Sequence, residues 1–487
     1  MTLGQYFEGI SYTTQLEQPQ EMEISSLTSD SRQIRPGCLF VCIKGGKFDG
    51  HEAAATALSQ GAAAVVVEHD LGLSQQILVE NTRSAYAMLC ANHFGNPSRK
   101  MKLVGTTGTN GKTTTTFLLK SILQSAGKKV GLMGTIHNEI ADMELPAKYT
   151  TPDPYQLHAM LDRMAEAGCE YVVMETSSHA LDQHRLDGCE FEVGIFTNLT
   201  QDHLDYHGTM ENYFAAKKRL FSMAKSSVIN IDDEHGALLA QELGNKAHTC
   251  SLVRDDADYT AKNVVFSAKG TDFILVGNNL IHRVHLCMPG KFSVANAMGA
   301  AAACLLLGLD IEEVADGLAK CPGVTGRAEV IHANVDFTII RDYAHTPDGL
   351  EKMISALKEY ATGKVVTLFG CAGNRDRTKR IHMAEMAAKY SDFVILTSDN
   401  PRDEDPMQII NDAKPGLDEY KTPYRIIPDR YAAIAWALDN TASGDILLLA
   451  GKGHEDYQVL HDETIYFDEK VVIQELLEGK PRLMHKP

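Results

Sequence analysis

The chain has 487 residues, with 46 lysines and arginines against 64 aspartates and glutamates, and a formal net charge of −18. A chain this acidic is not expected to bind nucleic acid or an anionic membrane surface. Hydrophobic residues make up 44% of it, and because single cores stop growing near ~250–300 residues we expect about three domains.

The expected location follows from what the sequence lacks. Residues 1–10 show no basic stretch followed by an apolar one, so no secretory signal peptide is expected there. The longest apolar run, residues 297–309, is shorter than the roughly 18–20 residues of a membrane span and predicts a buried helix. The ten cysteines lie singly, without CxxC pairs, which favours reduced thiols over a disulfide framework. We therefore expect a cytoplasmic α/β protein.

The first region alternates strand-like and helix-like segments. Residues 38–43 (CLFVCI) and 62–70 (AAAVVVEHD) are apolar runs typical of buried strands, and residues 51–61 (HEAAATALSQG) form an alanine-rich stretch that predicts a helix. Glycine, proline and polar residues in the segment 94–100 (FGNPSRK) interrupt this pattern. A first domain boundary is expected there.

The next region opens on a glycine-rich loop, residues 105–116 (GTTGTNGKTTTT). An apolar strand precedes the loop, and a helical pattern follows it and stops at Gly127. The amides of such a loop and the helix N-terminus suit phosphates, with Lys112 reaching the β/γ-phosphates and the Thr113 hydroxyl on Mg²⁺. The general P-loop pattern wants glycine where this chain has Thr106, so a Gly/Thr-rich turn with a solvated lysine is the alternative.

Two later strands end in groups that suit a metal. Residues 171–179 (YVVMETSSH) predict a strand that ends on Glu175, an oxygen donor of the kind that Mg²⁺ prefers. Residues 193–208 (VGIFTNLTQDHLDYHG) end a second strand and supply His203 and His207. Their i, i+4 spacing leaves zinc open, although the glutamate of an HExxH motif and a third clear ligand are missing. Lys217 lies on a predicted helix, where most lysines are solvated.

Three polar segments are predicted as loops from their residues alone, namely 29–37 (SDSRQIRPG), 149–157 (YTTPDPYQL) and 177–185 (SSHALDQHR). A second domain boundary is expected at 321–330 (CPGVTGRAEV). Beyond it, strand-like runs that each end in polar residues alternate with helices such as 347–360 and 431–440; the runs are 337–345, 364–373, 392–402 and 445–455. This alternation predicts a mainly parallel, doubly wound sheet whose polar strand ends line one cleft.

Several stretches, in order along the chain, resemble the Mur ligases of bacterial cell-wall synthesis. They are TGTNGKT (107–113), ETSSHALDQHR (175–185), FTNLTQDHLDYHG (196–208) and DYAHTP (342–347). TSDNPRDEDP (397–406) and AGKGHEDYQ (450–458) resemble the members that add diaminopimelate. The family's loop pattern requires no glycine at the Thr106 position, which removes the mismatch with the general P-loop.

The resemblance implies an α/β fold of three domains. Residues 1–96 would form a smaller N-terminal domain that binds the uridine nucleotide. Residues 97–325 would form a central ATP-binding P-loop domain around a parallel sheet, and residues 326–487 a Rossmann-like, amino-acid-binding domain with a doubly wound sheet. The segment 232–287 gives no prediction.

The family's functional residues are carried over position by position. Those implied to bind ATP are Gly108, Thr109, Asn110, Gly111, Lys112, Thr113, Thr114, Asn296, Arg327 and Asp342. Those implied to bind the UDP-muramoyl dipeptide are Ser31, Thr150, Thr151, Ser177, Gln183 and Arg185. Metal-binding roles are implied for Thr113, Glu175, His203 and Lys217, with Lys112, Lys217 and His203 catalytic and Lys217 carbamylated by CO₂. Diaminopimelate would contact Arg375, Asp399, Asn400, Pro401, Arg402, Gly451 and Glu455.

The implied reaction converts the D-Glu γ-carboxylate of UDP-N-acetylmuramoyl-L-alanyl-D-glutamate to an acyl phosphate with ATP. An amine of meso-diaminopimelate then displaces phosphate and forms an amide. ATP, two Mg²⁺ ions and the Lys217 carbamate are the expected cofactors, and a monomer without nucleic-acid or membrane partners is expected. Three alternatives remain open: L-lysine as the amino acid, a folylpolyglutamate-type ligase, and a non-ligase P-loop ATPase switch.

Overall fold

The computed structural model describes residues 1–46, 48–267, 270–277, 279–480 and 482. The chain divides into two compact units. The first comprises residues 1–107, 127–195 and 215–227, and the second comprises residues 108–126, 196–214 and 228–487. Strand β12 (Ala224–Asn230) crosses the boundary between them at residues 227 and 228.

The N-terminal part of the first unit is a small α/β domain with the sheet order β1-β5-β4-β3-β2, in which β2 to β5 run parallel and β1 antiparallel. Its elements are α1 (Leu3–Tyr6), β1 (Thr13–Thr14), η1 (Pro19–Glu21), β2 (Leu27–Thr28), η2 (Ser31–Gln33), β3 (Leu39–Val41), η3 (Gly50–Ala53), α2 (Ala54–Ser59), β4 (Ala64–Val67), β5 (Gln76–Leu78) and α3 (Thr82–His93).

Alternate side chains of β3 and β4 fill two cores, one on each face of this sheet. Leu39 and Val41 pack against residues of α1 and α3, whereas Phe40 packs against residues of α2. Apolar residues on both faces are what a strand buried between helices needs, and this is why the runs 38–43 and 62–70 have no polar alternation. The predicted strands and helix of this region are confirmed.

The rest of the first unit carries part of a second sheet, in the order β11-β6-β10-β7-β8-β9. Its parallel centre is β6, β10 and β7, and β8 and β9 form an antiparallel hairpin at the edge. The elements are η4 (Pro97–Lys100), β6 (Lys102–Thr107), β7 (Val130–Met133), β8 (His137–Ile140), β9 (Met143–Pro146), α5 (Pro154–Glu166), β10 (Tyr171–Glu175), α6 (Ser178–Asp182), β11 (Phe191–Phe196) and α8 (Met210–Met223).

Two loop predictions in this region are wrong in part. Helix α5 begins at Pro154, inside the segment 149–157 that was expected to be a loop. The segment 177–185 was expected to be a loop, but it contains helix α6. The Ser177 hydroxyl accepts a hydrogen bond from the Ala180 amide and caps the helix, while Ala180 and Leu181 are buried. An N-cap serine followed by two buried apolar residues stabilises one short helical turn, although the segment is polar on average.

The second unit contains the helix that follows the glycine-rich loop and a sheet in the order β16-β15-β14-β13, largely antiparallel. Helix α4 packs against α10 and α11. The elements are α4 (Lys112–Ser125), α7 (Leu204–His207), α9 (Glu234–Leu243), η5 (Gly244–Lys246), β13 (Ala247–Ser251), β14 (Tyr259–Ser267), β15 (Gly270–Gly277), β16 (Leu280–Leu286), α10 (Lys291–Leu306) and α11 (Ile311–Lys320). Strands β13 to β16 thus lie within the segment 232–287, for which no structure was predicted.

Helix α10 accounts for the long apolar run. Residues 296–304 are all buried, as expected for a core helix. Within the part of the chain that the structure describes, no helix combines the length and the apolar composition needed to cross a membrane.

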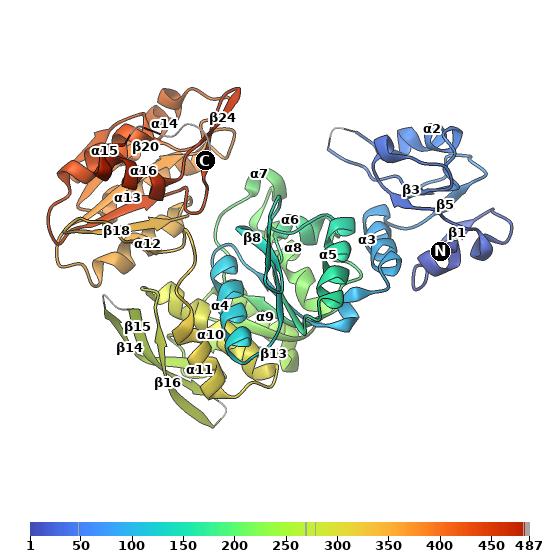
Figure 1. Ribbon diagram of the computed structural model, residues 1–487, viewed down its shortest axis with the longest axis horizontal. Coiled ribbons are helices and arrows are strands. Elements are labelled where there is room, and N and C mark those ends of the chain that lie inside the picture. Colours follow the sequence, from blue (N-terminus) through green and yellow to red (C-terminus); the bar gives the residue numbers. More distant parts are fainter. Residues whose placement is uncertain (47, 268–269, 278, 481, 483–487) are drawn as a thin grey trace. The chain divides into compact units, whose positions relative to one another are not determined.

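The C-terminal part of the second unit is a doubly wound sheet in the order β17-β18-β22-β19-β20-β21, parallel except for β17. Residues of α12, α13 and α14 pack on one face and residues of α15 and α16 on the other (Figure 1). The elements are β17 (Glu329–Ile331), β18 (Thr338–Asp342), α12 (Pro347–Lys358), β19 (Val365–Cys371), α13 (Thr378–Tyr390), β20 (Phe393–Ser398), α14 (Pro406–Asp418), β21 (Tyr424–Ile426), α15 (Arg430–Asn440), β22 (Ile446–Ala450), β23 (Tyr457–Leu460), β24 (Glu463–Tyr466) and α16 (Glu469–Glu478).

This topology confirms the predicted fold of the region and fixes where its polar residues lie. Strands β18, β20 and β22 are parallel members of one sheet, so their carboxyl ends meet at one edge. Asp342 ends β18, Asp399 follows β20, and Gly451 follows β22.

All ten cysteines lie in the described part of the chain and are free thiols. Nine of them are buried, and Cys287 is exposed.

Candidate active site

The glycine-rich loop connects β6 directly to α4. Two of its residues have positive φ angles, +149° at Gly108 and +88° at Gly111, and Gly111 is the N-cap of α4. A Cβ atom on Gly108 would lie 1.9 Å from Thr197 Oγ1, and one on Gly111 would lie 2.2 Å from Asn296 Oδ1. Glycine is therefore required at both positions for conformation and for space.

The Lys112 side chain folds back over this loop. Its Nζ donates hydrogen bonds to the carbonyl oxygens of Gly108 and Thr109, both at 2.9 Å. The next two residues, Thr113 and Thr114, are buried in the first turn of α4. An ammonium group, a helix N-terminus and loop amides thus lie together, an arrangement that suits phosphate groups.

Side chains from two other segments of the second unit lie against this loop. Asn296 of α10 packs against Gly111. Arg327 Nη2 donates to Thr113 Oγ1 at 3.3 Å, and its guanidinium lies 4.4 Å from the centre of the Tyr343 ring. Two of the predicted ATP-binding residues from outside the loop, Asn296 and Arg327, therefore lie beside it.

Asp342, the third predicted residue from outside the loop, is buried at the end of β18. Its carboxylate accepts hydrogen bonds from the amides of Ala328 and Ala344, both at 2.7 Å. Burial raises the pKa of Asp342, and the nearby Arg327 guanidinium partly opposes that rise. The Asp342 carboxylate thereby holds Ala328, just before β17, and Ala344, just after β18, and it faces Arg327.

Asn110 also contacts the C-terminal part of the second unit, since its Nδ2 donates to Asp348 Oδ2 at 2.9 Å. A cavity of about 180 Å³ adjoins this contact and is lined by Asp348, Asp202 and Lys379 among others. Burial would raise the pKa of Asp202, but His345, His203 and Lys379 lower it to about 2. The sequence had not singled out Asp348 or Asp202.

In the first unit, Glu175 ends β10 as predicted and is almost fully buried. Its Oε1 accepts from the Thr135 amide at 2.8 Å, and its Oε2 accepts from the Thr135 hydroxyl at 3.0 Å. A Cβ atom on Gly134 would lie 2.6 Å from Glu175 Oε1, so that glycine leaves space for the carboxylate. Thr135 and Gly134 had not been predicted.

Most of the residues expected to bind the muramoyl dipeptide lie around Glu175. The Thr151 hydroxyl donates to the Glu175 carbonyl oxygen at 2.7 Å and accepts from the Ser177 amide at 3.0 Å. Arg185 Nη1 donates to the Thr151 carbonyl oxygen at 3.1 Å, and its Nη2 donates to Gln183 Oε1 at 2.7 Å. These contacts join five predicted residues into one polar cluster.

The remaining members of these sets lie elsewhere in their units. Thr150 Oγ1 lies 3.1 Å from Thr135 Oγ1, beside the cluster, whereas Ser31 starts η2 in the N-terminal domain. Lys217 lies on α8 with its side chain only 1% exposed, against the usual solvation of helix lysines. His203 is exposed and has a left-handed backbone, while His207 is buried with its ring 5.0 Å from the Tyr213 ring.

The residues expected to bind the amino acid gather at the carboxyl ends of β20 and β22. Asn400 Nδ2 donates to Glu455 Oε2 at 2.8 Å. A Cβ atom on Gly451 would lie 2.8 Å from Asp399 Oδ2, so the glycine allows the two strand ends to approach each other. Burial raises the pKa of Glu455, Lys452 lowers it, and the neighbouring Asp399 carboxylate raises it further.

Arg402 closes this cluster from a strained turn. Its backbone is left-handed, with φ +53°, and its amide donates to the Val459 carbonyl oxygen at 3.1 Å. The half-buried guanidinium donates to the Gly373 carbonyl oxygen at 2.8 Å. Pro401 before it is buried, whereas Arg375 is exposed and donates to the Asn374 carbonyl oxygen.

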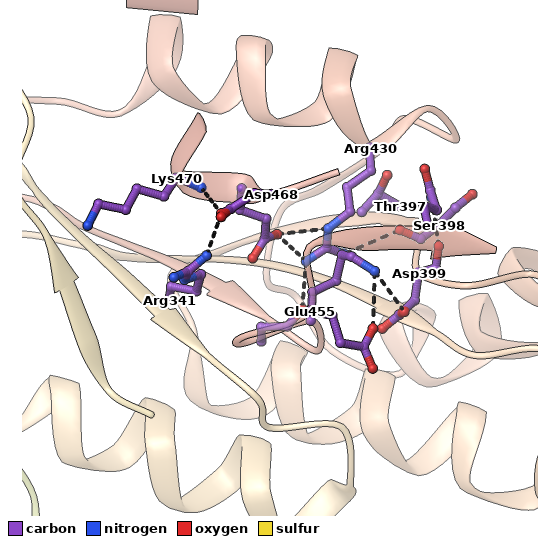
Figure 2. A network of polar contacts seen from close by, with 12 residues as sticks. Arg341, Thr397, Ser398, Asp399, Arg430, Glu455, Asp468 and Lys470 are labelled. Carbon is purple, nitrogen blue, oxygen red and sulfur yellow. Dashed lines mark hydrogen bonds and ion pairs between the residues drawn. The ribbon is translucent and has the colours of Figure 1, made fainter. Parts of the chain in front are cut away.

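A buried ion pair between Arg430 and Glu469 lies beside the two strand ends. Figure 2 shows Arg430 near Ser398 and Asp399. Arg430 Nη2 donates to Glu469 Oε1 at 2.7 Å and to the Ala450 carbonyl oxygen at 2.9 Å, and Arg430 Nη1 donates to the Ser398 carbonyl oxygen at 3.3 Å. Both side chains are 0% exposed. Ser398 and Ala450 directly precede Asp399 and Gly451, so this pair fixes the backbone from which the cluster projects.

Three members of this cluster, two of them buried and Tyr343 half-buried, were not predicted from the sequence. Lys452 is fully buried between Asn400 and Glu455, Gln458 Nε2 donates to the Asp399 carbonyl oxygen at 2.7 Å, and Tyr343 faces both carboxylates. Lys452 and Gln458 lie within the stretch 450–458 that carried the family resemblance. A lysine two residues after an apolar parallel strand was the signal available for Lys452.

Comparison with known proteins covers all of these regions. Residues 23–92 match the Mur ligase family catalytic domain, residues 106–304 match the Mur ligase middle domain, and residues 326–453 match the Mur ligase glutamate ligase domain. A curated relative from Clostridium acetobutylicum, a UDP-N-acetylmuramoyl-L-alanyl-D-glutamate–2,6-diaminopimelate ligase, is 46% identical over 94% of this chain and 95% of its own length. The chain belongs to the Mur ligase family.

Two further comparisons agree with this Mur ligase assignment. The UDP-N-acetylmuramoyl-L-alanyl-D-glutamate–2,6-diaminopimelate ligase of Clostridium botulinum is 43% identical over 98% of this chain and 99% of its own. A solved structure of an enzyme of that name is 34% identical, with a TM-score of 0.71, and covers 95% of this chain and 96% of its own.

Proposed function

We propose that this Mur ligase joins meso-2,6-diaminopimelate to UDP-N-acetylmuramoyl-L-alanyl-D-glutamate, with hydrolysis of ATP to ADP, in peptidoglycan precursor synthesis. Relatives of nearly the same length carry this activity in their names. The observation that carries the proposal is the cluster at the ends of β20 and β22. It combines the Arg402 guanidinium with the Asp399 and Glu455 carboxylates, which suits an amino acid whose far end has both a carboxylate and an ammonium.

ATP would bind at the glycine-rich loop. The loop amides and the α4 N-terminus would receive its phosphates, and Lys112 would exchange its bonds to the loop carbonyl oxygens for phosphate oxygens. Asn296 beside Gly111 would contact the adenine, and Arg327 with Asp342 would reach the nucleotide from the C-terminal domain. The further loop residues in this set are Gly108, Thr109, Asn110, Thr113 and Thr114.

The residues expected to hold Mg²⁺ fit that ion by their chemistry. Thr113 and Glu175 supply buried oxygen donors, and a carbamate on Lys217 would supply two more, with His203 as a nitrogen donor. The burial of Lys217 favours the neutral amine that reacts with CO₂. Bound Mg²⁺ would neutralise the charge that develops during phosphoryl transfer.

The polar cluster around Glu175 would orient the muramoyl dipeptide so that its D-Glu γ-carboxylate meets the ATP γ-phosphate. Thr150, Thr151, Ser177, Gln183 and Arg185 would make these contacts, and Ser31 would contact the uridine end. Phosphoryl transfer turns this carboxylate into an acyl phosphate, which the amine of diaminopimelate then attacks, releasing phosphate. Correct orientation of amine and acyl phosphate is the main contribution that the protein makes to this second step.

The domain boundaries, the location of the protein and its oligomeric state are also proposals. The boundaries near residues 96/97 and 325/326 would separate uridine-binding, ATP-binding and amino-acid-binding domains. The protein would act as a cytoplasmic monomer on small-molecule substrates. A folylpolyglutamate-type ligase would lack the uridine-binding domain. In this chain, residues 23–92 match the Mur ligase family catalytic domain.

A competition assay tests the substrate. The protein receives ATP, the UDP-muramoyl dipeptide and equal amounts of meso-diaminopimelate and L-lysine, and both products are quantified. We expect diaminopimelate to be preferred by roughly 10⁴-fold, because L-lysine would leave the Arg402 guanidinium without its carboxylate. Arg402→Ala should remove most of the preference, whereas Arg425→Ala, an exposed arginine on β21, should keep it. Comparable incorporation of L-lysine by the unmodified protein would contradict the proposal.

A further inference from the structure

Lys452 lies at the centre of the proposed amino-acid site with its side chain completely buried. Its Nζ donates to Glu455 Oε2 at 3.2 Å and to Asn400 Oδ1 at 3.3 Å, and it lies 3.9 Å from Asp399 Oδ1. The Tyr457 ring covers the ammonium, with its centre 5.6 Å from Nζ. A buried ammonium is costly unless opposite charges offset it, and here two carboxylates do so.

The charges in this cluster balance. Asp399 and Glu455 are two carboxylates, and Lys452 lies near both as a cation. Arg402, two residues beyond Asn400, supplies a second positive charge near the Tyr457 phenol. The Asp399 and Glu455 side chains lie close together in Figure 2. If Lys452 were absent, the cluster would carry one excess negative charge, and it would attract a ligand whose far end is purely cationic.

We propose that Lys452 is a specificity-determining residue that makes the site electrically neutral and so matches it to an amino acid with a zwitterionic far end. The inference rests on the proposed function. Lys452 acts through Asp399 and Glu455, because its positive charge weakens the attraction of these two carboxylates for a cationic ligand. Arg402 then attracts the carboxylate at the far end of the substrate. Arg402 and Lys452 therefore share the selection against L-lysine.

This assignment predicts how charge variants of the substrate behave. The far end of meso-diaminopimelate carries both charges, so its binding leaves the cluster neutral. L-lysine would bring one excess positive charge into a buried site, and L-2-aminopimelate, with a carboxylate alone, would bring one excess negative charge. Uncompensated charge is expensive in such surroundings, so both analogues should be disfavoured by the unmodified protein.

The other ionisable groups that face the cluster do not disturb this balance. Burial raises the pKa values of Tyr343 and Tyr457, so both phenols are neutral. Burial, with Arg327, Arg341 and Lys452 nearby, lowers the pKa of His454 to about 3, so its imidazole is neutral as well. The remaining charged groups lie at the edge of the cluster. Arg327 faces Asp342, and Arg341 forms ion pairs with Glu329 and Asp468. Asp456 lies near Tyr457.

The decisive test uses Lys452→Met, which removes the charge and keeps an unbranched side chain. The ratio of kcat/KM for L-lysine to that for meso-diaminopimelate should rise about 10- to 100-fold, the effect of one unit charge acting over several ångströms in a partly shielded site. The ratio should also rise with pH in this variant. Without Lys452, Glu455 would be protonated in the lower part of the pH range and would ionise as pH increases, and its negative charge would then attract L-lysine. The unmodified protein should show a ratio that is flat with pH.

Matched variants separate this role from mere packing. Lys452→Arg retains the charge and should keep the unmodified ratio even if overall turnover falls. Leu449→Ala, which perturbs the same strand end without a change of charge, should also keep it. The double variant Lys452→Met/Glu455→Gln restores neutrality and should return the ratio toward that of the unmodified protein.

The result remains decisive if Lys452→Met does not fold. Glu455→Gln then leaves one excess positive charge, and L-2-aminopimelate should gain at least 10-fold relative to diaminopimelate. An unchanged ratio in Lys452→Met, or no such gain in Glu455→Gln, would overturn the inference. If the unmodified protein makes no diaminopimelate product at all, the proposed function itself is wrong, and the two failures are thus distinguishable.

Discussion

The Arg430–Glu469 pair gives the sharpest stability prediction for this protein. Glu469→Ala would remove the carboxylate and leave a guanidinium that is 0% exposed with only the carbonyl oxygens of Ser398 and Ala450 as acceptors. Removing one partner of a buried ion pair typically costs ~3–5 kcal/mol, because the other charge remains buried and uncompensated. A loss of this size is a large fraction of the ~5–15 kcal/mol that stabilises an ordinary domain.

The chain offers a local probe for this measurement. Its only tryptophan is Trp436 on α15, the helix that begins at Arg430, and its ring stacks on Phe393 with 5.5 Å between ring centres. Tryptophan fluorescence during urea denaturation therefore follows the C-terminal domain, even if other parts of the chain unfold separately. We expect the midpoint urea concentration to fall for Glu469→Ala with little change in slope.

Two further variants test the reasoning behind the magnitude. Glu463→Ala, at an exposed position on β24, should change stability by no more than ~0.5 kcal/mol. Arg430→Met/Glu469→Leu replaces both charges by apolar side chains and should recover much of the loss, as buried pairs often tolerate such replacement. A cost below ~1 kcal/mol for Glu469→Ala, or a double variant as unstable as the single one, would refute the account based on an uncompensated charge.

Three other variants test the remaining features. Lys112→Ala should abolish ligation while circular dichroism and the urea midpoint stay unchanged, since loss of the phosphate-facing cation should cost several kcal/mol of transition-state stabilisation, on the order of 10³-fold in rate; near-normal turnover would exclude the loop from the reaction. Lys217→Ala should be inactive and regain activity with short-chain carboxylates, whereas Lys218→Ala, at the half-buried neighbouring position, should be active without them; electron density for an unmodified Lys217 ammonium would contradict the carbamate. Glu404, hydrogen-bonded to buried Arg380, has its pKa lowered from 4.5 to about 2, so it contributes stability above pH 4.5 that is lost as pH falls toward 2. The stability gap between the unmodified protein and Glu404→Gln should therefore close over that range, and a gap independent of pH would refute the pairing.

Much of the fold was predictable because its strands are buried on both faces. The runs 62–67 and 446–450 are continuously apolar for this reason, and the polar residues that come after them mark the carboxyl ends of the strands. The order of strands in the C-terminal sheet brings Asp399 and Gly451 to one edge, so part of the site followed from the alternation of strands and helices alone.

Other features depend on contacts that local patterns do not contain. Strands β14 to β16 pair antiparallel with exposed side chains such as Val265 and Ile281, and this mixed composition gave no clear signal. Helix α6 depends on the Ser177 cap and on burial beneath it. The burial of Lys217 and Lys452 could not be predicted either, since a lysine is solvated in most settings and only its neighbours in space decide otherwise.

The pattern of thiols has a practical consequence for following the reaction. Because nine of the ten cysteines are buried, a thiol-reactive dye should label the native protein at Cys287, which follows β16, without any mutation. Trp436, in the C-terminal domain, is the natural energy-transfer donor for such a dye. The labelled protein would thus carry its own distance reporter, and successive addition of ATP, nucleotide substrate and amino acid would reveal which of them draws the amino-acid site toward the phosphate loop.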